Sequence, residues 1–226
     1  MKKIIVLFTL LTFALVGCKD DNDSTGPSSN TGLIPLEVGN WWEYERYIYE
    51  TSTEEQGDKQ GSTRLDVIAK TTFLGKDAYQ IIESSEFASD TSYIAIEDGA
   101  LYLGGHIIEI QPELAPYWVK VYDPDSTSWV SMDIEFSYYG DLIKFIGNAT
   151  NEGETTVSID GNNQKAVKIE QTTIIETTTT YSGQTQKYTI TQEYLLVFGL
   201  GFYHVITKYD DELSDDTIMV LVDYEI

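Results

Sequence analysis

The stretch YIAIEDGALYL, residues 93–103, decides the expected fold class of this chain. Two short runs of apolar, aromatic and β-branched residues flank Asp98-Gly99. Asp-Gly between such runs is a strong hairpin signal, because both central residues of a two-residue type I′ turn need a positive φ. The stretch therefore predicts two antiparallel strands joined by a tight turn.

The same pattern recurs along the rest of the chain. Turn signals at Leu74-Gly75, Asp160-Gly161 and Ser182-Gly183 separate runs rich in β-formers, and residues 218–226 alternate like a strand. No segment after residue 32 has a convincing amphipathic helical pattern. We therefore expect an all-β domain with little helix, built on a mostly antiparallel, strongly twisted sheet. Two architectures remain open: a curved open sheet closing toward a half-barrel, and a two-layer sandwich.

The first eighteen residues have a different character. Lys2 and Lys3 precede an apolar run of 13 residues, 4–16. A helix needs about 20 apolar residues to cross a bilayer, so this run has the length of a signal-peptide core instead. The run ends in Leu15-Val16-Gly17-Cys18, and Cys18 is the only cysteine of the chain, which excludes an intramolecular disulfide.

Leu15-Val16-Gly17-Cys18 resembles the lipobox of bacterial lipoproteins. The resemblance implies cleavage after Gly17 and acyl chains on the thiol and the new amino group of Cys18. Two or more acyl chains hold a protein at a membrane where one chain does not. The alternatives are an ordinary secretory signal with an incidental cysteine, and an uncleaved membrane helix.

These features divide the chain into a signal peptide (1–17), a lipidated cysteine with a flexible acidic tether (18–32) and a single β domain (33–226). Residues 19–32 contain no residue suited to a core, and as a coil they would reach on the order of 20 Å. Lys19-Asp20-Asp21 resembles the export signal that sends lipoproteins of Bacteroidota to the cell surface. We expect an outer-membrane lipoprotein, at the cell surface or otherwise facing the periplasm.

The charge of the chain excludes one class of partner. The precursor carries a net charge of −23, and removing residues 1–17 also removes Lys2 and Lys3, which leaves 12 − 37 = −25. A nucleic-acid-binding protein needs a basic patch to neutralise phosphates, and the sequence offers none. The same acidity disfavours direct docking on anionic lipids, so the lipid anchor alone should hold the protein at the membrane.

Two further stretches bear on function. The pattern Pro35-Leu36-x-x-Gly39-Asn40-x-Trp42-x-Tyr44 resembles the start of uncharacterised exported all-β proteins of bacteria, a group that implies no activity. Residues 106–131 hold three of the five prolines, which predicts a long loop or edge pieces, and long loops often carry function. The aromatic residues of this stretch form the candidate binding surface, or alternatively a lid over the open end of the sheet. They are Tyr117, Trp118, Tyr122 and Trp129.

The sequence contains no established catalytic or metal-binding motif, so we assign no catalytic residue, no metal and no cofactor. Asp123–Ser128 lacks the glycine and the final glutamate that an EF-hand calcium loop needs. We expect a binding or interaction module whose ligand could be a protein, a glycan or an apolar molecule. The alternatives are a carrier of an apolar ligand in a β half-barrel and a hydrolase built on carboxylates. A carrier needs an apolar cavity, whereas a module would have its concave face filled by side chains.

Overall fold

The computed structural model describes residues 33–86, 88–106, 116–210 and 214–226. These residues form twelve strands: β1 (Trp41–Glu50), β2 (Glu55–Phe73), β3 (Lys76–Ser85), β4 (Ser89–Glu97), β5 (Ala100–His106), β6 (Pro116–Tyr122), β7 (Ser128–Tyr138), β8 (Asp141–Ile159), β9 (Asn162–Thr178), β10 (Thr185–Val197), β11 (Gly201–Tyr209) and β12 (Thr217–Glu225). All belong to one antiparallel sheet, which confirms the predicted all-β class. Within the described ranges, no helix is long and apolar enough to cross a membrane.

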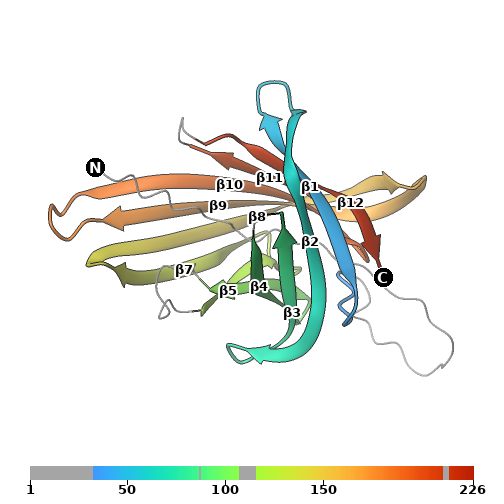
Figure 1. Ribbon diagram of the computed structural model, residues 1–226, viewed down its shortest axis with the longest axis horizontal. Coiled ribbons are helices and arrows are strands. Elements are labelled where there is room, and N and C mark those ends of the chain that lie inside the picture. Colours follow the sequence, from blue (N-terminus) through green and yellow to red (C-terminus); the bar gives the residue numbers. More distant parts are fainter. Residues whose placement is uncertain (1–32, 87, 107–115, 211–213) are drawn as a thin grey trace.

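The sheet consists of two meanders joined through the first and last strands. Its order is β6-β5-β4-β3-β2-β1-β12-β11-β10-β9-β8-β7. Trp41 lies opposite Glu225, and Ile48 lies opposite Thr217. The sheet twists and curls so that edge strand β6 contacts β7, β8 and β9 (Figure 1). Of the two architectures left open by the sequence, the structure therefore has the curved, barrel-like sheet.

We call the junction between edge strands β6 and β7 the seam. Neighbouring strands elsewhere in the sheet are joined by backbone ladders, whereas β6 and β7 each stand at an end of the strand order. A side chain bridges them instead, because the indole Nε1 of Trp129 on β7 donates a hydrogen bond of 2.7 Å to the carbonyl of Lys120 on β6. On β8, next to the seam, Gly147 lies against Ser131 and Met132 so closely that no side chain would fit.

Tight turns set the register of the hairpins, as the sequence predicts. Asp98 and Gly99 have φ values of 52° and 79°, and Asp160 and Gly161 have values of 51° and 78°. Positive φ at both central residues is the signature of the type I′ turn, whose twist matches that of the strands it joins. The turn between β8 and β9 thereby fixes Asp160 at the end of a long hairpin.

The inner face of the curled sheet holds the main hydrophobic core. Its largest fully buried side chains come from both meanders: Trp42, Tyr44, Tyr194, Phe145, Phe202, Leu65, Ile81, Ile94, Leu101 and Ile169. The hydroxyl of Tyr44 on β1 donates to the carbonyl of Phe202 on β11, at 3.2 Å, and so ties the two meanders together inside the core. Before β1, Leu33, Ile34 and Leu36 are also buried in this core.

The proline-rich part of the chain forms the two edges of the sheet. Of the two expectations for residues 106–131, a long loop or edge pieces, the structure has edge pieces: residues 116–122 and 128–138 form the edge strands β6 and β7. Residues 107–115 lie outside the described part. Pro116 begins β6, a position where a strand tolerates proline. The polar, exposed stretch that follows Glu54 is also part of a strand, because β2 begins at Glu55. Pairing with β1 holds that exposed stretch extended.

Candidate ligand-binding site

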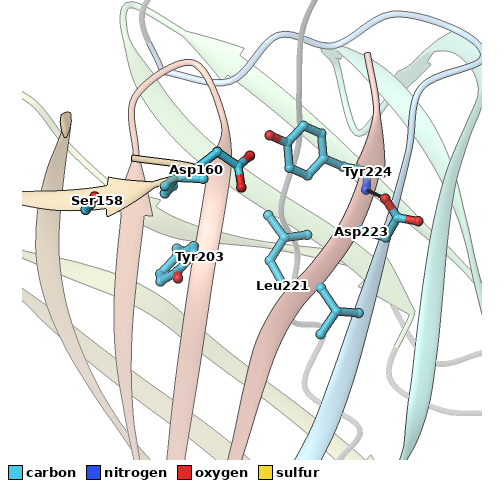
Figure 2. Close-up of a pocket in the computed structure, with 8 residues that line it drawn as sticks. Ser158, Asp160, Tyr203, Leu221, Asp223 and Tyr224 are labelled. Atoms are coloured by element: carbon cyan, nitrogen blue, oxygen red, sulfur yellow. Dashed lines mark hydrogen bonds between the residues drawn. The ribbon is translucent and has the colours of Figure 1, made fainter. Parts of the chain in front are cut away.

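A pocket opens where β11 and β12 separate. Their ladder covers residues 204–207 of β11 and 217–220 of β12, and beyond it the strands part. The turn between β8 and β9 borders this gap, and together they form an open pocket of about 390 Å³. We call it the β11–β12 pocket (Figure 2), and its lining residues come from three separate parts of the chain: Ser158, Ile159, Asp160, Tyr203, Leu221, Val222, Asp223 and Tyr224.

The polar groups of the pocket face one another across the gap. Figure 2 shows the ring of Tyr224 extending from β12 toward Asp160 of the β8–β9 turn, with Leu221 and Tyr203 beside them. Because side chains alternate along a strand, Asp223 turns to the other side of β12, where its carboxylate accepts a hydrogen bond from the Tyr224 backbone N–H at 2.8 Å. Buried Ile159 anchors the turn that carries Asp160. The pocket thus offers a carboxylate, phenol hydroxyls, aromatic rings and an apolar wall.

A second group of polar residues lies inside the curled sheet. Gln171, Thr173, Gln192 and Thr207 are buried on β9, β10 and β11. The Tyr194 hydroxyl donates to Gln192 Oε1 at 2.8 Å, and Gln192 Nε2 donates to Thr207 Oγ1 at 3.4 Å. Burial raises the pKa of the Tyr194 hydroxyl well above its ordinary value, so this group stays a neutral hydrogen-bond donor.

Charged groups also face the interior from the other meander. Glu83 lies opposite fully buried Leu65 and next to Asp90 on β4, and Arg46 lies opposite buried Met219. Burial, assisted by the charge of Asp90, raises the pKa of the Glu83 carboxyl to about 7, although Arg46 opposes the shift. A pKa of about 7 means that the Glu83 carboxyl is present in both its protonated and its charged form near neutral pH.

Glu83→Gln is expected to abolish part of the pH dependence of stability. The folded-state pKa of about 7 lies above the ordinary 4.5, so the contribution of the protonated carboxyl is complete below about pH 4.5 and is lost as the pH rises through 7. Because the residue is partly exposed, we expect the free energy of unfolding of the native protein to fall by about 2 kcal/mol between pH 5 and 8. Urea unfolding at both pH values measures it. Equal pH slopes for the native protein and Glu83→Gln would contradict the assignment.

Two of the four aromatic residues predicted from the sequence lie on opposite faces of β6. Tyr117 packs against the main core, and burial followed by the charge of Asp90 raises its pKa to about 12. Trp118 faces outward, where its ring meets Phe73 edge-on at 5.1 Å and Tyr102 at 6.3 Å. Gly104 allows this contact, since a Cβ there would lie 2.7 Å from the Trp118 ring.

The other two predicted residues have structural contacts of their own. Tyr122 is buried in the main core and meets Phe198 edge-on at 6.4 Å. Trp129 bridges the seam through its bond to Lys120. The structure therefore does not bring the four residues together on one surface. Cys18, the tether and the signal peptide lie outside the described residues.

The acidic residues of the turn between β6 and β7 form local contacts of their own. Asp123 forms an ion pair of 3.0 Å with Lys120 and accepts a hydrogen bond from the backbone N–H of Asp125 at 3.1 Å. Among the residues that the structure describes, no group of three or more His, Cys, Asp or Glu side chains could hold a metal ion.

The pocket residues were not predicted as a site. Asp160-Gly161 was identified as a turn, and Tyr203 follows a Gly-x-Gly segment that predicts a bulge or bend. Both signals concern the backbone. Nothing in the sequence indicates that this turn meets β11 and β12.

Comparison with known proteins finds a similar fold but no matching family. No family model and no curated protein matches the chain. Among solved structures, a "putative lipoprotein" from Parabacteroides distasonis ATCC 8503 has a similar fold, with a TM-score of 0.56, 11% identity and coverage of 88% of this chain and 100% of that chain. A "putative exported protein with YmcC-like fold" from Bacteroides fragilis NCTC 9343 aligns with a TM-score of 0.47, 9% identity and coverage of 87% and 100%. The chain shares its fold with the first of these proteins.

Proposed function

We propose that this protein is a lipid-anchored binding module of the bacterial outer membrane that takes a small ligand in the β11–β12 pocket. The observation that carries the proposal is the position of the only cysteine, Cys18, directly after a charged and apolar leader. The acidic tether of residues 19–32 would then link the acylated cysteine to the sheet. Lys19-Asp20-Asp21 supports the cell surface as the location.

Two observations support the proposal, one for the anchor and one for the binding module. The protein of similar fold from Parabacteroides distasonis is described as a lipoprotein, which agrees with an anchored role. Large side chains from both meanders, among them Trp42, Tyr194 and Phe202, pack together on the inner face. A concave face filled by its own side chains favours a module over a carrier of an apolar ligand. The proposal includes no catalytic step.

Cys18→Ala is expected to remove the lipid anchor and so release the protein from the membrane. The native protein should begin at Cys18 and carry acyl chains, so it should partition into the detergent phase. The variant has no thiol to acylate, so it should be found in the aqueous phase. Mass spectrometry of the amino-terminal peptide reports both processing and acylation. Ser28→Ala, in the tether, is the matched control and should remain anchored. An unmodified Cys18 thiol in the native protein would contradict the proposal of a lipid anchor.

A further inference from the structure

We propose that the β11–β12 pocket binds a small organic cation, an alkylammonium group that is free or part of a larger ligand. The inference rests on the proposed function in that it names the chemical class of the ligand for the same pocket. Three features of the pocket support it: its charge, its aromatic lining and its size.

The charge of the pocket is negative. No lysine, arginine or histidine is among its lining residues, and Asp160 is free of the ion pairs found among the described residues. Asp223 and its cross-strand neighbour Glu43 add negative charge nearby. The whole chain carries −23, and such a field attracts cations and repels anions over about 10 Å at ordinary salt. An anionic ligand is therefore disfavoured here.

The aromatic lining suits a cation with apolar substituents. Tyr203 and Tyr224 line the pocket and are partly exposed, and the negative face of an aromatic ring attracts an ammonium group. Leu221 provides an apolar contact for the methyl or methylene groups of the ligand. A carboxylate beside tyrosine rings is a combination that recognises alkylammonium groups and gives a neutral ligand no comparable electrostatic gain.

The size of the pocket limits the ligand. A volume of about 390 Å³ lies near the lower end of the range of about 300–1,000 Å³ that is usual for small-molecule sites. The pocket would therefore hold a single ammonium group and its substituents. The positive φ values of Asp160 and Gly161 define the backbone of the β8–β9 turn, which places Asp160 at the pocket before binding.

The test is a titration of the mature lipidated protein, in detergent micelles, with tetramethylammonium chloride or choline chloride. We expect saturable shifts of the Tyr203 and Tyr224 ring signals in NMR spectra. Asp160→Asn should weaken binding about tenfold, because it removes the carboxylate and keeps the shape of the side chain. Asp58→Asn removes the same charge from an exposed and distant position on β2, so it should change the affinity less than about twofold.

Variants of the ring separate packing from recognition. Tyr224→Phe keeps the aromatic face and should retain binding, whereas Tyr224→Leu should weaken it about fivefold. Tyr181→Leu, at a fully exposed tyrosine in the β9–β10 connection, is the matched control and should bind like the native protein. If Tyr224→Leu fails to fold, the Asp160→Asn and Tyr224→Phe results still decide the question.

Three results would overturn the inference: no saturable shift with either cation, equal losses for Asp160→Asn and Asp58→Asn, or equal binding of uncharged methyl glucoside. Each can occur while Cys18→Ala still detaches the protein from the membrane. The lipid-anchored role would then stand without this ligand class. Conversely, cation binding by a protein whose Cys18 carries no acyl chain would support the pocket and reject the anchor.

Discussion

Replacing Trp42 by alanine is expected to lower the free energy of unfolding by about 4 kcal/mol, the usual cost of truncating a large aromatic residue in a core. The Trp42 side chain is fully buried on the inner face of β1, opposite Leu65 on β2 and Tyr224 on β12. Its removal leaves a cavity where the two meanders join, and the paired strands restrict its collapse. Urea unfolding followed by circular dichroism measures the loss.

The adjacent tryptophan is the matched control. Trp41 faces outward, where Arg64 lies 3.9 Å from the ring centroid and Nε1 donates to Glu225 at 2.8 Å. These are surface contacts, so Trp41→Ala should cost about 1 kcal/mol or less. Similar losses for the two variants would show that the inward and outward faces of β1 are assigned wrongly.

Gly147→Ala is expected to destabilise the seam by about 3 kcal/mol, at the upper end of the range for overpacking. An added Cβ would lie 2.3 Å from Ser131 Oγ and 2.7 Å from Met132 Cγ. Ser131 and Met132 are both buried, and the contacting atoms are near the beginning of each side chain. Edge strand β7, which carries both residues, must therefore move to make room. The readout is again the free energy of unfolding in urea.

Gly57→Ala is the control for this second change. A Cβ at Gly57 would approach Ile48 no closer than 3.4 Å, an ordinary contact. An unfolded chain with alanine at this position also has less conformational freedom to lose on folding than one with glycine. This variant should be as stable as the native protein or slightly more stable. Ser131→Gly, combined with Gly147→Ala, should restore part of the loss by removing the shorter contact. No restoration would mean that the strain arises elsewhere.

The sequence predicts strands and turns well because both depend on neighbouring residues. The alternation around Asp98-Gly99 and Asp160-Gly161 is local, and both turns adopt the expected backbone. For residues 106–131, the prolines predicted either a long loop or edge pieces, and the structure has the edge strands β6 and β7. Pro116 is the first residue of edge strand β6, and Pro124 lies in the turn that follows it. Neither interrupts a ladder in the middle of a strand.

The curvature of the sheet and the pocket could not be predicted in the same way. Alternation determines which face of a strand is buried, but it is the same in a half-barrel and in a sandwich. The pocket requires residue 160, residue 203 and residues 221–224 to meet, and that depends on how far β11 and β12 pair before they separate. The register of a ladder is a tertiary property, since a turn fixes it only within its own hairpin.

The pairing of β1 with β12 has a consequence for the order in which the molecule folds. Hairpins within each meander close short loops, whereas Trp41 and Glu225 are 184 residues apart when they bond. Closing so long a loop costs more chain entropy, and contacts of this range slow folding. Each meander can assemble while the other is still unformed, but the edge of β1 stays open until β12, which follows every other strand in the chain, becomes available. The sheet is thus completed by its most distant partners, and until then the exposed edge of β1 is the place where a neighbouring molecule could pair in error.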